Sequence, residues 1–490
     1  ANKHLPELKT HDRYGNRIDW VDFHPSWHQL MALAWKHEVP NLAWRTNHKN
    51  GHVARAVLSY VWNQIEQGTG CPTGMAYASY AGFVAEPALG IWAEKVKGTE
   101  YEFSRREVGS KPSVVIGYAM TEKQGGSDLR ETRTTARFSH TSDYHGRPAH
   151  WYELTGHKWF FSAPQSDAHL VLAQAAGGLS CFLVPRWRPD GSKNPLQVLR
   201  LKRKMGNVSN ASSETELRGA LAWMVGEEGR GVRTIIDMVA MTRFDCMIGS
   251  TAGQRAAVAQ ALHHCAIRSA FGKVLNQQPL MQNVLADLVL EHEGSLALTL
   301  RMARALDHRA DPHEDLLVRL VTAVGKYWIC KRTPHHAYEA MECIGGSGVM
   351  EDSMMPRLYR EAPVNAIWEG SGNVQCLDVL RAMSKTPAVV DAFFAELQHS
   401  KGAHATLDRY VADLARDFGD RSDLEYRARD LVDRMALALQ ASLLVRHAPI
   451  FVGDAFCRSR LDQCGAHNYG ALPRGVDTAA IIERATPRIG

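Results

Sequence analysis

The sequence predicts a mainly α protein with a central β domain and a C-terminal helical extension. Apolar residues recur at helical spacing before residue 113, short β-type runs separated by turn residues fill 114–226, and helical periodicity returns from Gly229. The chain has 490 residues, which is enough for two to four domains. We therefore expect helices, then a β domain, then a bundle, then further helices.

The composition is that of a soluble globular protein, with 45% hydrophobic and 22% charged residues. The net charge of +5 is mildly basic and does not by itself require nucleic acid as a partner. Nine cysteines without a CxxC pair indicate reduced, mostly buried thiols. The polar start and the lack of long apolar runs predict no signal peptide, no membrane span and a cytoplasmic location.

The four expected domains follow from these changes in pattern. Residues 1–113 form the N-terminal helical domain, and 114–226 form a small β sandwich or barrel. Residues 227–385 form a four-helix bundle, because four long helical segments have short connections. These segments are 232–271, 279–310, 316–346 and Asn373–Lys385. Residues 386–490 form a helical extension, with breaks at Gly419, Pro449 and Pro473.

The segment TEKQGGSD, Thr121–Asp128, leaves a predicted strand and offers backbone N–H groups and hydroxyls. Its glycines allow a flat or phosphorylated ligand to approach the backbone closely. The segment lacks the GxGxxG pattern and no helix clearly follows, so it does not predict a Rossmann fold. A plain β-turn is the alternative interpretation.

The segment HKWFFSAPQSD, His157–Asp167, places three aromatic rings beside Ser162 at a strand end. Taken alone, it favours core packing of Trp159, Phe160 and Phe161. The alternative is a wall against which a planar ring stacks, with Ser162 hydrogen-bonded to that ring.

Three other segments leave alternatives open. ECIGGSGV, Glu342–Val349, has more glycines than a helix C-cap needs, which indicates close approach of either another backbone or a ligand. His263–His264 and Glu291–His292–Glu293 lack metal spacing, so we interpret them as surface or core residues and predict no metal site. LRLKRKM, Leu199–Met205, is interpreted as a solvated strand edge, with a nucleic-acid patch as the alternative.

A single glutamate, Glu369, stands in NAIWEGSGN between Ile367–Trp368 and a run of small residues. A lone glutamate is usually an exposed structural residue. Here the apolar neighbours can shield the carboxylate from water, as a general base requires. The start of the next helix also offers N–H groups to a nearby anion. Glu369 is therefore a candidate base, with a loop residue as the alternative.

Together these segments resemble the acyl-CoA dehydrogenase family over about residues 20–385. The motifs, in chain order, are MTEKQGGSD, GHKWFFSAPQSDAHLVLAQAAGGLSCFLVPR, MTRFDC, RSAFG, GGSG and PRLYREAPVNAIWEGSGN. Several look closest to one branch, the adaptive-response flavoproteins associated with alkylation damage, which also carries a C-terminal helical extension.

The resemblance implies that FAD binds between the β domain and the bundle. The first flavin loop is matched by Met120, Thr121, Gly126 and Ser127. The strand that backs the isoalloxazine is matched by Phe160, Phe161 and Ser162. Positions that reach FAD from a neighbouring subunit are matched by Arg268, Gly345 and Gly346, which implies a homotetramer. The final flavin segment is matched by Ile367, Trp368, Gly370, Ser371, Asn373 and Leu377.

The resemblance also implies an FAD-dependent oxidoreductase that acts on the CH–CH group of acyl-CoA. Glu369 falls on the glutamate that serves as the base, which removes the α-proton while the β-hydrogen leaves as hydride to the flavin. MTRFDC offers no glutamate at the place where isovaleryl-type members carry their base. Arg381, on the next helix, is expected to project toward the substrate pocket.

The branch implies binding of double-stranded DNA in the adaptive response, with weak dehydrogenase capability on isovaleryl-type acyl-CoA retained. Residues 389–490 carry 13 lysines and arginines against 14 acidic residues, a net charge of −1, which is not a strongly basic module. An arginine-bearing face would have to carry DNA, for example through Arg421, Arg427, Arg429 and Arg434.

Two other functions compete. One is an ordinary short- or branched-chain acyl-CoA dehydrogenase that passes electrons to an electron-transfer flavoprotein. The other is a binding protein in which the flavin only supports folding.

Overall fold

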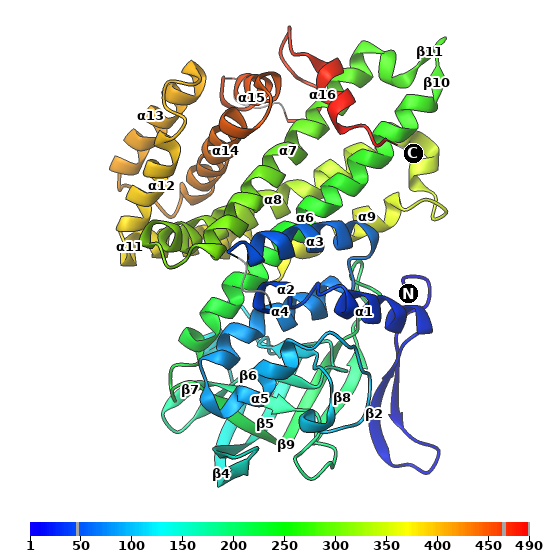
Figure 1. Cartoon of the computed structure of the whole chain (residues 1–490), viewed down its shortest axis with the longest axis vertical. Helices are drawn as coiled ribbons and strands as arrows, with labels where there is room; N and C mark the ends of the chain where they lie inside the picture. The colour runs from blue at the N-terminus through cyan, green and yellow to red at the C-terminus, as the bar shows by residue number, and fades with distance from the viewer. Residues whose placement is uncertain (46–48, 463–466, 489–490) are drawn as a thin grey trace. The chain divides into compact units, whose positions relative to one another are not determined.

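A computed structural model of the chain describes residues 1–45, 49–462 and 467–488. The chain divides into two compact units, Ala1–Thr242 and Arg243–Gly490 (Figure 1). The division falls within one long helix, α6, Gly231–Ile267. The expected fold class, mainly α with a central β domain and a C-terminal helical region, is confirmed.

The first unit begins with a hairpin that the sequence analysis missed. Strands β1, Glu7–His11, and β2, Arg17–Asp22, pair antiparallel. The Asp12 side chain accepts hydrogen bonds from the N–H groups of Tyr14 and Asn16, which closes the turn. Most of β1 faces water, so it lacks the apolar alternation that reveals a strand. The expected helices follow: α1 Pro25–Lys36, α2 Leu42–Arg45, α3 Gly51–Ile65, α4 Gly70–Val84 and α5 Gly90–Val96.

A seven-stranded sheet forms the rest of this unit. Its strands are β3 Ile116–Ala119, β4 Thr135–Tyr144, β5 Arg147–Ser162, β6 Ala168–Ala175, β7 Gly178–Pro185, β8 Leu196–Leu201 and β9 Ser212–Val225. The pairings β4–β5, β5–β9, β9–β7, β7–β6 and β6–β4 close into a ring, which makes a barrel. β8 pairs only with β9, so the edge-strand interpretation of LRLKRKM holds over Leu199–Leu201.

The sheet is buried on both faces along strand β6. Val171 and Ala173 lie in the core inside the barrel, with Phe161 and Phe182. The alternate residues Leu170 and Leu172 lie in a second core together with α4 and α5 residues, which include Phe83 and Trp92. Because side chains alternate across a strand, one apolar run can support two layers.

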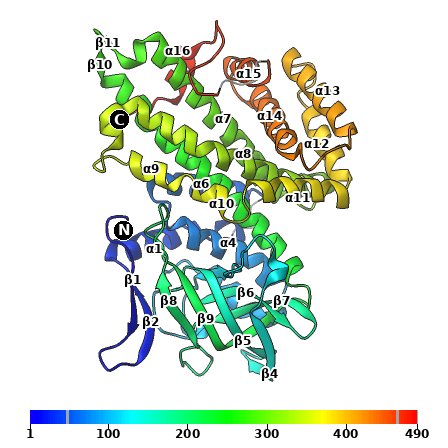
Figure 2. The same cartoon turned by 180° about the vertical axis from the view of Figure 1, so that it is seen from behind.

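The second unit is a helical bundle formed by the greater part of α6 with three further helices: α7 Pro279–Asp307, α8 Pro312–Ile344 and α11 Gly372–Lys385 (Figure 2). The sequence predicts that the first helix continues to Phe271. It ends at Ile267 instead, where a tight hairpin of β10, Ser269–Ala270, and β11, Lys273–Val274, turns at Gly272 with φ +79. Short helices α9, Met355–Glu361, and α10, Val364–Ile367, precede α11.

The C-terminal residues pack against this bundle in the same unit. Their helices are α12 Ala388–Gln398, α13 Ala405–Gly419, α14 Ala428–His447, α15 Ile450–Cys457 and α16 Thr478–Ala485, with breaks after Gly419 and at Pro449 as predicted. Buried Glu396 on α12 accepts hydrogen bonds from Arg301 on α7 and Arg446 on α14. Burial alone would raise the pKa of Glu396, but the two arginines outweigh it and lower that pKa to about 2.

The cysteines agree with the expectation of reduced thiols over the part of the chain that is described. Eight are free thiols, and all of these except Cys71 are buried. Cys464 lies outside the described residues. Across the described ranges, no helix is long and apolar enough to cross a membrane.

Candidate functional site

The predicted first flavin loop is folded tightly against strand β5. The Trp159 N–H donates to the Thr121 carbonyl at 2.9 Å, which joins the loop to the WFFS segment. Gly126 packs directly on Thr121, because a Cβ added at Gly126 would lie 2.3 Å from Thr121 Oγ1. Met120 and Thr121 are half-buried, whereas Ser127 is exposed. The loop therefore presents small groups and backbone, as close approach to a ligand requires.

A buried ion pair anchors this loop. Lys158 Nζ donates to Glu122 Oε1 at 2.7 Å, and both side chains are almost fully buried. The Thr134 hydroxyl and the Arg133 N–H also donate to the Glu122 carboxylate, at 2.6 and 2.8 Å. Burial alone would raise the pKa of Glu122, but Lys158 and these donors outweigh it and lower that pKa to about 2. Glu122 stays ionised and ties the loop to β5.

The three aromatic rings of the WFFS segment face different surroundings. Phe161 is 1% exposed and lies in the barrel core, so the core-packing interpretation holds for this ring. It does not hold for Phe160, which is 43% exposed. Trp159 is half-buried, and Lys202 Nζ lies 3.2 Å from its ring centroid. Half-buried Ser162 ends the strand. The exposed ring of Phe160, on the strand whose backbone bonds the glycine loop, fits the stacking of a planar cofactor.

In the second unit, Glu369 lies in the short loop between α10 and α11. Its φ is +57, the left-handed region that non-glycine residues rarely adopt, and Gly370 follows at +96. Such backbone conformations cost about 1–3 kcal/mol and persist where the surroundings fix them. Glu369 and Trp368 are half-buried, whereas Ile367 is 66% exposed, so of the two apolar neighbours only Trp368 is placed to shield the carboxylate within this unit.

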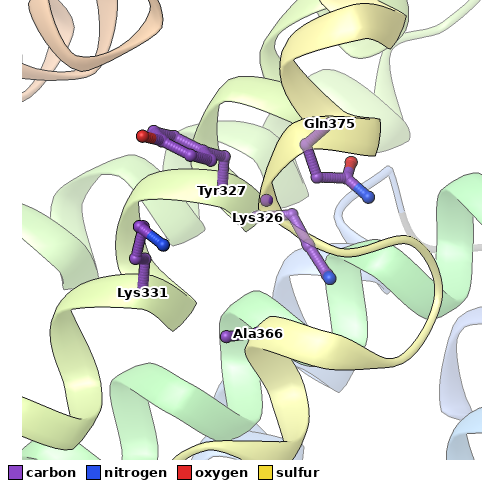
Figure 3. Close-up of a pocket in the computed structure, with 6 residues that line it drawn as sticks. Lys326, Tyr327, Lys331, Ala366 and Gln375 are labelled. Carbon is purple, nitrogen blue, oxygen red and sulfur yellow. The ribbon is translucent and has the colours of Figure 1, made fainter. Parts of the chain in front are cut away.

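Donors from three helices hold the backbone of this loop. Lys326 Nζ of α8 donates to the carbonyls of Trp368, at 2.8 Å, and Gly370, at 2.5 Å. Arg243 Nε of α6 donates to the Glu369 carbonyl at 3.0 Å, and so does Gln375 Nε2 of α11. Figure 3 shows the Lys326 nitrogen inside the curve of the chain that joins α10 to α11.

A carboxylate on α11, that of Asp378, holds the loop donor Arg243 in place. Asp378, 3% exposed, accepts from Arg243 at 2.7 Å and from Arg319 at 3.1 Å. Burial alone would raise the pKa of Asp378, but the two arginines lower it. Arg381 pairs with the same carboxylate at 3.4 Å and is more than half exposed. That contact places Arg381 beside Asp378, and its place in a substrate pocket stays a prediction.

The remaining residues of the final segment lie around the start of α11. Trp368 Nε1 donates to Asn365 Oδ1 at 2.9 Å, which fixes the orientation of the indole. Ser371 is the N-cap of α11, and Asn373 in its first turn accepts from Arg429 of α14 at 2.8 Å. Leu377 is 37% exposed. A small pocket beneath the loop is lined by Lys326, Tyr327, Lys331, Ala366, Gly372 and Gln375.

The structure does not bring Arg268, Gly345 and Gly346 to this loop. They follow the C-terminal ends of α6 and α8, which lie together because Cys265 Sγ donates to the Cys343 carbonyl at 3.7 Å. All three residues are exposed. From Lys326 to the end of α8 the helix extends about 27 Å, at 1.5 Å per residue. One unit therefore presents the loop of Glu369 and the RSAFG segment at separate places.

Three family models match the chain in succession. They are the adaptive response protein AidB N-terminal domain over residues 1–103, the acyl-CoA dehydrogenase middle domain over 117–220, and the acyl-CoA dehydrogenase C-terminal domain over 229–384. The putative acyl-CoA dehydrogenase AidB of Escherichia coli is 44% identical over 95% of this chain and 85% of its own length. The chain belongs to the acyl-CoA dehydrogenase family.

Solved structures of this family agree with the fold. A crystal structure of a Caenorhabditis elegans acyl-CoA dehydrogenase in complex with C11-CoA superimposes with a TM-score of 0.86 at 25% identity, over 94% of this chain and 83% of that one. A Bacillus anthracis acyl-CoA dehydrogenase complexed with FAD superimposes with a TM-score of 0.70 at 17% identity, over 96% and 89%, and supports the fold alone.

The family is FAD-dependent, so the chain is a flavoprotein oxidoreductase. The exposed Phe160 ring, on the strand bonded to the glycine loop, fits this cofactor. The individual residues assigned to FAD stay predictions.

The sequence analysis missed the residues that hold the site together. Lys326 and Arg243 contact a loop 42 to 126 positions further along the chain. Lys158 lies within the GHKWFFS motif, and its buried partner Glu122 lies 36 positions away. No local pattern distinguishes these side chains from exposed charges.

Proposed function

We propose that the chain is an AidB-like flavoprotein with acyl-CoA dehydrogenase capability, in which Glu369 is the base. The observation that carries this proposal is the left-handed backbone of Glu369, held by donors from α6, α8 and α11. Restraint of the loop by donors from three helices gives the carboxylate one direction, which a base must keep toward its proton.

The reaction follows from the acidity of the substrate. The α-proton of an acyl thioester is only weakly acidic, so a fixed carboxylate close to it lowers the barrier to its removal. Glu369 takes that proton, and Trp368, pinned by Asn365, limits the access of water to the carboxylate. Bound FAD would supply the acceptor for the β-hydrogen, which leaves as hydride. The weak capability inherited by this branch is expected to favour isovaleryl-type acyl chains.

An anaerobic titration of the purified flavoprotein with a series of acyl-CoAs tests this proposal. Bleaching of the flavin absorbance by at least one acyl-CoA is expected, and Glu369→Gln should abolish it while FAD content stays unchanged. Flavin that no acyl-CoA bleaches would contradict the dehydrogenase assignment and favour the flavin as a folding element. Rapid turnover with an electron-transfer flavoprotein would support the ordinary dehydrogenase instead.

The working form is proposed to be a cytoplasmic homotetramer. Arg268, Gly345 and Gly346 lie exposed at a separate place from the base loop, which is the arrangement needed if they complete the FAD site of a neighbouring subunit. Light scattering of the wild-type protein and Arg268→Ala tests this: a monomeric wild-type protein that retains FAD would contradict it.

Binding of double-stranded DNA in the response to alkylation is the second candidate. The match of residues 1–103 to the AidB N-terminal domain favours it. Two of the four arginines of the expected DNA-binding face are already engaged within the chain and are less available to phosphates. Arg427 donates to the carbonyls of Asp420 and Ser422, and Arg434 pairs with Asp417. Among the residues that the structure describes, Arg421 has no such partner and is exposed.

The salt dependence of binding to a labelled duplex tests this second function. A phosphate contact adds about 0.9 to the slope of log affinity against log salt, so Arg421→Ala should lower the slope by about that amount. The matched control, Arg427→Ala, should lower it less. A wild-type protein with no duplex affinity at low salt would overturn the proposal.

A further inference from the structure

The ammonium of Lys326 is buried and hydrogen-bonds to backbone carbonyls. Lys326 is 1% exposed, and within residues 1–45, 49–462 and 467–488 no carboxylate lies within ion-pair distance of it. A buried cation of this kind is costly unless polar groups replace its water. The groups that do so are two carbonyls of the base loop, those of Trp368 and Gly370.

These two carbonyls flank Glu369 on either side. Between the end of α10 at Ile367 and the start of α11 at Gly372, the chain leaves helical geometry, so its carbonyls need donors from elsewhere. Gln375 and Arg243 both donate to the carbonyl of Glu369 itself. Lys326 joins the residue before Glu369 to the residue after it and so spans the left-handed turn.

We propose that Lys326 is a positioning residue for the base. Its ammonium closes the turn Trp368–Gly370 and thereby fixes the backbone of Glu369 at φ +57, which sets the direction of the carboxylate. This inference rests on the proposed function of Glu369. A lysine suits the task because an ammonium has three N–H donors at one nitrogen, and charge-assisted hydrogen bonds are stronger than neutral ones.

The alternative role for Lys326 is general support of the bundle, and the surroundings argue against it. Its partners are both in the base loop, whereas the helices of the bundle pack through apolar residues such as Leu288, Val289 and Leu290. Lys331 provides a matched comparison. It lies on the same helix and lines the same pocket, but among the described residues it donates to none of the three loop carbonyls.

The test compares Lys326→Met with Lys331→Met in the FAD-loaded protein. For Lys326→Met we expect unchanged FAD content, little change in KM, and a fall in kcat or in the rate of flavin reduction on the order of tenfold to a hundredfold, because misplacement of a reacting group by about 1 Å has such effects. Hydrogen exchange at the amides of residues 368–372 should rise. Lys326→Arg, which keeps charged donors, should recover part of the rate, and Lys331→Met should behave as wild type.

A Lys326→Met protein with the wild-type rate and wild-type exchange in 368–372 would overturn the proposal. If this variant does not fold, Lys326→Gln, which keeps an amide donor, takes its place with the same expected direction. Exchange in the loop does not depend on catalysis. Loss of protection in Lys326→Met together with full activity of Glu369→Gln would therefore refute Glu369 as the base while the restraint of the loop stands.

Discussion

Replacing Lys158 by methionine is predicted to destabilise the β domain and to weaken FAD binding. The substitution leaves the Glu122 carboxylate buried without its cation and also removes the donor to the Leu172 carbonyl at 2.8 Å. Removing one partner of a buried ion pair costs about 3–5 kcal/mol. Because Thr134 and Arg133 still donate to Glu122, we expect the lower end, about 3 kcal/mol.

Thermal unfolding and FAD titration measure this effect. For a unit of this size, about 3 kcal/mol corresponds to a fall in Tm of about 6–12 °C. FAD affinity should fall as well, since Glu122 anchors the loop that carries Thr121 and Gly126. The exposed pair Arg137–Glu153 in the same sheet provides the control, because Arg137→Met should cost less than about 1 kcal/mol. A Lys158→Met protein with the Tm and the FAD affinity of the wild type would refute the role of this ion pair.

Three further predictions concern packing and pH. Gly126→Ala places a Cβ against Thr121 Oγ1, so it should cost about 1–3 kcal/mol in stability and weaken FAD binding, as measured by flavin fluorescence. Neighbouring arginines outweigh burial and lower the pKa of Glu291 and of Glu396 to about 2. The stability that these two ionised carboxylates contribute should therefore be complete above about pH 4.5 and be lost as pH falls toward 2. Acid unfolding followed by circular dichroism measures this loss. Burial raises the pKa of Asp433 to about 6, so the folded protein is most stable while this carboxyl is protonated, below about pH 4, and loses stability as pH rises through 6 and the carboxyl ionises. Asp433→Asn removes the ionisation and should therefore raise Tm at pH 8 more than at pH 5. An equal change in Tm at both pH values would contradict this.

Much of the fold follows from local patterns. The helix over Pro312–Ile344 has a long periodic sequence, and strands such as β6 and β7 are short apolar runs bounded by turn residues. The hairpin of Glu7–His11 and Arg17–Asp22 is not evident from the sequence because its first strand, which is mostly exposed, leaves little apolar alternation. The end of α6 at Ile267 escaped notice because apolar residues continue through the turn at Phe271, which is almost fully exposed.

The candidate site was predictable where a motif is continuous in sequence. The residues of NAIWEGSGN and of TEKQGGSD lie close together because each segment is continuous in the chain. The supports of those loops were not predictable in the same way. Lys326 and Lys158 reach their partners only after helices or strands pack, and a lysine that will be buried looks in sequence like a lysine that will be solvated.

The split within the WFFS segment shows a related limit. Alternation along a strand predicts that neighbouring rings point to opposite faces. It does not predict which face is covered. The structure buries Phe161 and exposes Phe160, and this distinction separates a core residue from a candidate flavin contact.

Exchange of the α-hydrogen of an acyl-CoA with deuterated solvent tests the role of Glu369 most directly. The measurement follows proton removal itself, in the FAD-loaded protein, by nuclear magnetic resonance of the recovered acyl-CoA. We expect the wild-type protein to catalyse exchange and Glu369→Gln to lose it while keeping its FAD. Exchange at the wild-type rate in Glu369→Gln would contradict the assignment of Glu369 as the base.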